Sequence, residues 1–129
     1  MRLLLDTHIL IWALAEPSRL PDAAREVLED TANQVLFSSA SIWEIAIKAS
    51  LGRVDFSVVP RLILEAAVST GFAELPVTAR AALKVAELPP HHRDPFDRIL
   101  VAQALTEPAQ LYTVDRKLAA YSELVVQVS

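Results

Sequence analysis

Short apolar runs alternate with longer stretches of helical pattern along the whole chain. The first run occupies residues 3–5 and ends directly in the charged residue Asp6. Short apolar runs bounded by polar turns are typical of strands that are buried on both faces of a sheet. The pattern predicts five such strands, at residues 3–5, 34–37, 72–75, 111–114 and 124–128.

Helices are predicted between the strands from the spacing of apolar residues and from the residues that begin or end helices. Gly52 and Gly71 follow two of these stretches, and Pro95 stands at the first position of another. The predicted helices cover residues 7–16, 21–33, 42–51, 58–70, 77–88, 95–106 and 115–121. Strands that alternate with helices predict an α/β fold, with a parallel sheet and helices on both of its faces.

Composition indicates one globular domain. A chain of 129 residues can build one hydrophobic core, so a single domain over residues 1–129 is predicted. Hydrophobic residues make up 53% and charged residues 22%, which excludes a disordered chain. No apolar stretch reaches the roughly 18 residues of a membrane span, and the first residues lack the cleavage site of a signal peptide. The absence of cysteine excludes disulfides and thiolate metal sites and fits a cytoplasmic protein.

Four acidic residues stand where predicted strands end or where predicted helices begin. Asp6 and Asp115 directly follow strands, Glu44 lies about one turn after another strand, and Asp97 opens the helix at 95–106. Because the carboxyl ends of parallel strands share one edge of the sheet, these acids can meet there. Crowded carboxylates repel one another and need cations, and hard oxygen ligands select Mg²⁺ or Mn²⁺. Such a site suits metal-dependent hydrolysis of phosphodiester bonds.

The same acids also have purely structural interpretations. Asp6 or Thr7 could cap the helix that follows, and Ser41 with Glu44 matches a capping box. Asp94 precedes a proline and is expected to be the N-cap of the next helix. A non-catalytic interaction domain, in which the acids serve only as caps, therefore remains an alternative, and metal titration would separate it from an enzyme.

Four short motifs follow one another in order across residues 3–118. They are Leu-Leu-Asp-Thr at 4–7, Ser-Ser-Ala-Ser-Ile-Trp-Glu at 38–44, Arg-Asp-Pro-Phe-Asp-Arg at 93–98 and Thr-Val-Asp at 113–115. This ordered set resembles the PIN-domain family, in particular the VapC toxins of VapBC toxin–antitoxin pairs. The resemblance implies a PIN-like three-layer α/β/α sandwich with a mainly parallel sheet. It also implies Mg²⁺-dependent endoribonuclease activity, with Mn²⁺ as a substitute ion.

The resemblance assigns roles to individual residues. Asp6, Glu44 and Asp97 match the three core acids of the family, and Asp115 matches a fourth, more variable one. These four are the expected catalytic residues and metal ligands. Three further residues are expected to support them: Asp94, Thr7 and Thr113. In this interpretation water attacks phosphorus in line and leaves a 5′-phosphate and a 3′-hydroxyl.

The charge balance argues against RNA binding through a broadly basic surface. The net charge is −4, although the chain would be formally neutral without the four site acids. The basic residues closest to these acids in the sequence are the expected phosphate contacts: Arg93, Arg98, Arg116 and Lys117. His91 and His92 are interpreted as loop residues rather than metal ligands, because adjacent side chains face different directions.

Apolar helices indicate protein partners. A hydrophobic content of 53% in a short chain predicts a homodimer, since small domains leave a large fraction of their surface exposed. Trp12 and Trp43 lie on apolar helices and are expected in the core or in an interface. The family resemblance implies a cognate VapB-like antitoxin that docks in an uncovered apolar groove.

Two other classes fit a small parallel sheet less well. An aspartyl-phosphate phosphatase with Asp6 as nucleophile needs a second Asp two residues later, where His8 stands. A receiver domain needs paired acids after the first strand and a lysine after a late strand, and neither is evident.

Overall fold

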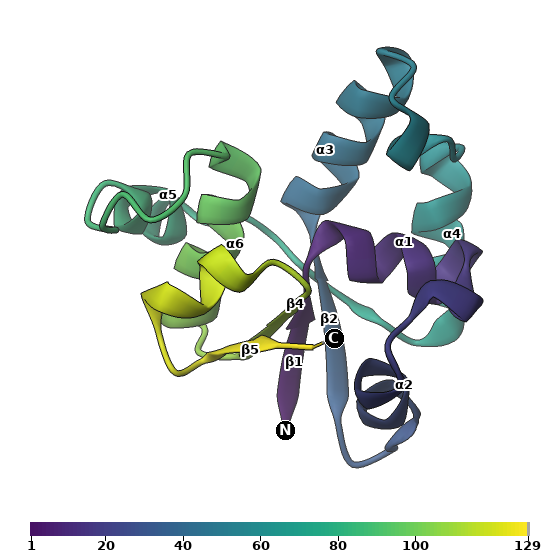
Figure 1. Ribbon diagram of the computed structural model, residues 1–129, viewed down its shortest axis with the longest axis horizontal. Coiled ribbons are helices and arrows are strands. Elements are labelled where there is room, and N and C mark those ends of the chain that lie inside the picture. Colours follow the sequence, from purple (N-terminus) through teal and green to yellow (C-terminus); the bar gives the residue numbers. More distant parts are fainter. Residues whose placement is uncertain (129) are drawn as a thin grey trace.

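Five parallel strands form the centre of the computed structural model, which describes residues 1–128 (Figure 1). The strands are β1 (Arg2–Leu5), β2 (Gln34–Ser38), β3 (Ala73–Leu75), β4 (Gln110–Thr113) and β5 (Val125–Gln127). Their order in the sheet is β3-β2-β1-β4-β5, and each of the four pairings is parallel. The predicted parallel sheet is therefore confirmed.

Helices cover both faces of this sheet. They are α1 (Thr7–Ala15), α2 (Asp22–Glu29), α3 (Ser39–Ser50), α4 (Pro60–Thr70), α5 (Ala79–Val85) and α6 (Pro95–Thr106). Short 3₁₀-helices lie at Pro17–Arg19, Val54–Phe56 and Arg116–Tyr121, the last of which is η3. Figure 1 shows α5 and α6 on one side of the sheet and α1, α2 and α4 on the other. The fold is the expected three-layer α/β/α sandwich.

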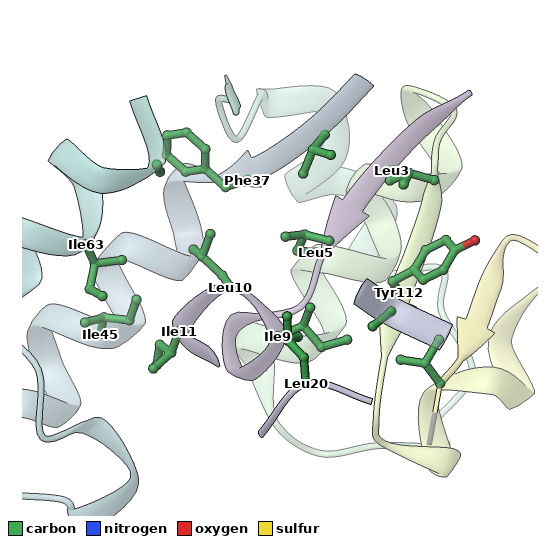
Figure 2. Packing of buried hydrophobic residues seen from close by; sticks show 14 of the residues in the cluster. Leu3, Leu5, Ile9, Leu10, Ile11, Leu20, Phe37, Ile45, Ile63 and Tyr112 are labelled. Carbon is green, nitrogen blue, oxygen red and sulfur yellow. The ribbon is translucent and has the colours of Figure 1, made fainter. Parts of the chain in front are cut away.

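The alternation of side chains along β1 explains why its apolar run is continuous. Leu3 and Leu5 point into one core with α1 and α4, whereas Leu4 points into a second core with α6. All three side chains are at most 1% exposed. Figure 2 shows Leu5 beside Leu10 of α1 in the first core. Burial on both faces is what a central strand of a parallel sheet requires.

The start of α3 differs from the prediction. The helix begins at Ser39, directly after β2, and Ser38 is its N-cap, with its hydroxyl accepting a hydrogen bond from the Ala40 N–H at 3.0 Å. Ser41 lies inside the helix, so the alternative interpretation of Ser41 and Glu44 as a capping box is wrong. The physical reason is that β2 passes into α3 without a turn, which puts the cap at the strand's last residue.

Other boundaries also differ. The helix predicted at 21–33 ends at Glu29, the one predicted at 77–88 covers Ala79–Val85, and the last predicted helix is the 3₁₀-helix η3. Among residues 1–128, no helix is long and apolar enough to cross a lipid bilayer.

Gln103 is a polar residue on the buried face of α6, among Leu100, Val101 and Ala104. It is 2% exposed, and its Oε1 accepts a hydrogen bond from the Ser38 hydroxyl at 2.6 Å. Its Nε2 donates to the carbonyls of Leu75 and Pro76 at 3.2 and 3.3 Å. Gln103 thus joins the ends of β2 and β3 to α6.

We predict that Gln103→Leu lowers the free energy of unfolding by about 1–3 kcal/mol, although leucine is more apolar. The substitution removes the acceptor of the buried Ser38 hydroxyl proton and a donor to the buried Leu75 carbonyl, and each unsatisfied group carries a desolvation cost. Urea denaturation measures the change. Gln34→Leu, at an exposed glutamine of β2, is the matched control and should change stability by less than about 0.5 kcal/mol. Equal effects at both positions would contradict the role of Gln103.

Candidate metal centre

Asp6 is held at the end of β1 by hydrogen bonds from two different elements. It is the N-cap of α1, and its Oδ1 accepts from the Ile9 N–H at 2.8 Å. Its Oδ2 accepts from the Val114 N–H, just beyond β4, at 3.3 Å. The side chain is 4% exposed. Burial raises the pKa of Asp6, and hydrogen bonds from Thr113, Ile9 and Val114 oppose the rise without cancelling it.

Glu44 projects from α3 and is also buried, at 2% exposed. Its Oε2 accepts from Lys48 Nζ at 2.6 Å, one helical turn further along α3. Within the described part of the chain, its Oε1 has no hydrogen-bond partner. A buried carboxylate oxygen without a partner is costly, so this atom points to a ligand that the chain does not supply.

Asp94 and Asp97 stand at the start of α6. Asp94 is the N-cap, as predicted, and its Oδ1 accepts from the Phe96 N–H at 2.8 Å. Asp97 lies one turn further on and caps nothing. Burial raises the pKa of Asp97 to about 7, helped by the negative charges of the other acids: Asp94, Glu44, Asp6 and Asp115. Because all of them act on Asp97, the structure brings the predicted acids to one place.

Asp115 follows β4 and begins η3. Its Oδ1 accepts from the Lys117 N–H at 2.9 Å, and its Oδ2 lies 2.8 Å from His92 Nε2. Partial burial alone would raise the pKa of Asp115, but the hydrogen bonds from Lys117 and His92 and the charge of Lys117 bring it below its usual value. One ligand atom each from His92, Asp97 and Asp115 lie within 4.8 Å of one another.

The two threonines differ in their roles. The Thr113 hydroxyl hydrogen-bonds to Asp6 and accepts from the Asp115 N–H at 3.0 Å, so it orients two of the acids. The Thr7 hydroxyl instead donates to the Ser41 hydroxyl at 2.9 Å. It joins α1 to α3, and it is not the carboxylate partner that the sequence predicted.

The four basic residues also separate into two kinds. Arg93, Arg116 and Lys117 are exposed beside the acids. The guanidinium group of Arg98 donates to the Tyr121 hydroxyl and to four carbonyl groups: those of Val85, Leu88, Pro89 and His92. Arg98 therefore holds the segment before α6 in place, and both of its terminal nitrogens are engaged there rather than in the phosphate contact that the sequence predicted.

Sequence reasoning missed two residues that contact the acids. Lys48 lies four residues after Glu44, a spacing that places both on one face of a helix, so this ion pair could have been predicted. The Lys48 Nζ also lies 3.9 Å from Asp94 Oδ2. His92 does lie in a loop, as the sequence predicted, but no local sequence pattern predicts its contact with Asp115, which is 23 residues away.

The donor set fits a divalent metal ion. Asp6, Glu44, Asp97 and Asp115 offer hard oxygen atoms, and the unpartnered Oε1 of Glu44 calls for a cation. The raised pKa of Asp97 agrees with this, because burial and the negative charges of the neighbouring acids both disfavour its ionised form in the absence of a cation.

Comparison with known proteins agrees with this geometry. A match to the PIN domain family covers residues 3–124. Ribonuclease VapC22 of Mycobacterium tuberculosis is 30% identical over 119 residues, which cover 92% of this chain and 90% of the relative.

Two solved structures share the fold. A chain in the crystal structure of VapBC2 from Rickettsia felis, bound to a promoter DNA fragment, has a TM-score of 0.72 at 20% identity, with 98% of this chain and 97% of that chain covered. PAE2754 from Pyrobaculum aerophilum has a TM-score of 0.60 at 22% identity, with 99% and 84% covered. Since the family match spans nearly the whole chain and the fold agrees, this chain belongs to the PIN-domain family.

Proposed function

We propose that this protein is a metal-dependent endoribonuclease that hydrolyses phosphodiester bonds in RNA. The observation that carries the proposal is the gathering of buried and half-buried acids at one edge of the sheet, with one oxygen of Glu44 unpartnered among the described residues. RNA as the substrate is supported by the similarity to a relative named as a ribonuclease.

Asp6, Glu44, Asp97 and Asp115 would hold Mg²⁺, with Mn²⁺ as a substitute. Bound there, the divalent cation supplies neutralisation of phosphate charge and activation of the attacking water. The chain itself orients the ligands: hydrogen bonds from Ile9, Val114 and Thr113 fix the carboxylate of Asp6. Arg93, Arg116 and Lys117 would contact phosphates of the RNA, a role that their exposure supports.

The protein would act as the toxin of a type II toxin–antitoxin pair, with a VapB-like antitoxin as its partner. The similarity to Ribonuclease VapC22 supports this role, as does the shared fold with a chain of the VapBC2 complex. An RNA substrate and such a partner both fit action in the cytoplasm.

A second candidate is a non-catalytic interaction domain whose acids serve as helix caps. Asp6, Asp94 and Asp115 do accept hydrogen bonds from backbone N–H groups at helix starts, which favours it. Capping does not account for Glu44 or Asp97, so the nuclease is the better explanation.

We predict that the purified protein cleaves RNA with Mg²⁺ or Mn²⁺ and not in excess chelator, because the acids repel one another unless a cation is bound. Cleavage of total RNA, followed by gel electrophoresis, is the measurement. Asp6→Asn, prepared in the same way, controls for contaminating nucleases and should be inactive. Undiminished cleavage in chelator would falsify the proposal and leave the non-catalytic alternative.

We predict opposite effects for two acids three residues apart. Asp97→Asn should abolish cleavage and leave the metal-free fold at least as stable, because it removes a buried charge among like charges. Asp94→Ala should cost about 1 kcal/mol through loss of the N-cap and should reduce cleavage without abolishing it. Thermal melts should show Mg²⁺ stabilising the wild type far more than Asp97→Asn. The reverse pattern would mean that the roles of the two acids are exchanged.

The metal-free stability of the wild type should also depend on pH through Asp97. Its pKa is about 7 in the folded protein and 3.8 as the usual value, so the folded state binds this proton more tightly. The stability from this group is therefore present at low pH and lost as pH rises from 3.8 to about 7. Over this window the free energy of unfolding of Asp97→Asn should increase relative to the wild type. A constant difference would show that Asp97 is not perturbed.

We predict a homodimer. An apolar groove of about 500 Å³ lies between α3, α5 and α6, lined in part by Trp43, Val77 and Phe96. The Trp43 side chain is 62% exposed, which is costly for a large aromatic group unless a partner covers it. Sedimentation at micromolar concentration should give a dimer for the wild type and a monomer for Trp43→Glu. Leu51→Glu, at the far end of α3, is the control and should stay dimeric. A monomeric wild type would refute this prediction.

A further inference from the structure

His92 lies between two of the proposed metal ligands, on the segment that precedes α6. Its Nε2 is 2.8 Å from Asp115 Oδ2 and 3.4 Å from Asp97 Oδ2. Its side chain is only 14% exposed. Asp115 follows β4 and Asp97 belongs to α6, so His92 contacts two acids that only folding brings together.

The other ring nitrogen decides what Nε2 can do. Nδ1 lies 3.0 Å from the backbone N of Asp94. A backbone N–H can only donate, so Nδ1 must be the acceptor and carry no proton. A neutral imidazole has one N–H, which is therefore on Nε2. His92 faces the acids as a hydrogen-bond donor and has no lone pair there for a metal ion.

The backbone around His92 holds the ring in this orientation. The His92 N–H donates to the Tyr121 hydroxyl at 2.9 Å, and the same hydroxyl accepts from Arg98 at 3.0 Å. Arg98 also donates to the His92 carbonyl at 3.3 Å. The residue is thus fixed by η3 on one side and by α6 on the other.

We propose that His92 is a positioning residue whose Nε2–H holds the carboxylate of Asp115 and which stays outside the set of metal ligands. This rests on the proposed metal-dependent function. The spacing of His92, Asp97 and Asp115 within 4.8 Å would suit a metal site with a histidine ligand, but the proton on Nε2 excludes that role. With Lys117 on Oδ1 and His92 on Oδ2, each oxygen of Asp115 is oriented and retains lone pairs for a cation.

Two substitutions separate the ring nitrogens. In His92→Gln, the amide nitrogen is as many bonds from Cβ as Nε2 is, so it can still donate to Asp115. In His92→Asn, the amide oxygen can still accept from the Asp94 N–H, but no donor reaches Asp115. Isothermal titration with Mg²⁺ should give affinity close to wild type for His92→Gln. For His92→Asn it should be roughly 10–100-fold weaker, the usual effect of losing a partner of a ligand. RNA cleavage should follow the same order.

A second measurement uses the unaltered protein. Nitrogen-15 NMR of the imidazole, at about pH 8 and above the usual histidine pKa, should give the Nε2–H tautomer of His92. The pattern should persist when Mg²⁺ is added. This NMR measurement does not depend on whether either variant folds.

Each outcome decides the inference. An Nδ1–H tautomer, or wild-type Mg²⁺ affinity in His92→Asn, would overturn it. So would equal loss of affinity in both variants, since that is the behaviour of a metal ligand. A wild type that neither binds Mg²⁺ nor cleaves RNA would instead overturn the proposed function, while the tautomer would still test the donor assignment.

Discussion

The crowding of five carboxylates at one edge of the sheet is the constraint on which the rest of the structure depends. Buried like charges repel one another and lose hydration, so each needs hydrogen-bond donors or a cation. Asp6, Asp94 and Asp115 obtain donors from backbone N–H groups at helix starts. Glu44 and Asp97 do not, and the unpartnered oxygen of the first and the raised pKa of the second mark the charge that remains unmatched.

The strand order explains why the acids meet at this edge. From the central strand β1 the chain builds β2 and β3 on one side and then β4 and β5 on the other. In parallel sheets with such a reversal, functional residues gather at the carboxyl ends of the strands, and Asp6 and Asp115 follow the two neighbours β1 and β4 at this edge. The helices α3 and α6 bring Glu44 and Asp97 to the same place.

Capping and metal binding are compatible in one carboxylate. In Asp6, the N–H groups of Ile9 and Val114 and the hydroxyl of Thr113 use three of the roughly four lone-pair sites of the carboxylate, which leaves one for a cation. The cap therefore sets the direction in which the carboxylate can bind a cation. For this reason the sequence alone could not separate the interpretation of the acids as caps from their interpretation as metal ligands. Glu44 and Asp97, which cap no helix, favour the interpretation as ligands.

The sequence by itself determined the succession of strands and helices along the chain and the acids that follow them. It could do so because apolar periodicity and helix-ending residues such as Gly71 are local properties. It also contained the Glu44–Lys48 spacing, although that signal was missed. Only the tertiary structure decided that Arg98 binds carbonyl groups and that His92 holds Asp115. The physical reason is that these contacts depend on how separate elements pack, and the chain encodes such packing through the whole core rather than through neighbouring residues.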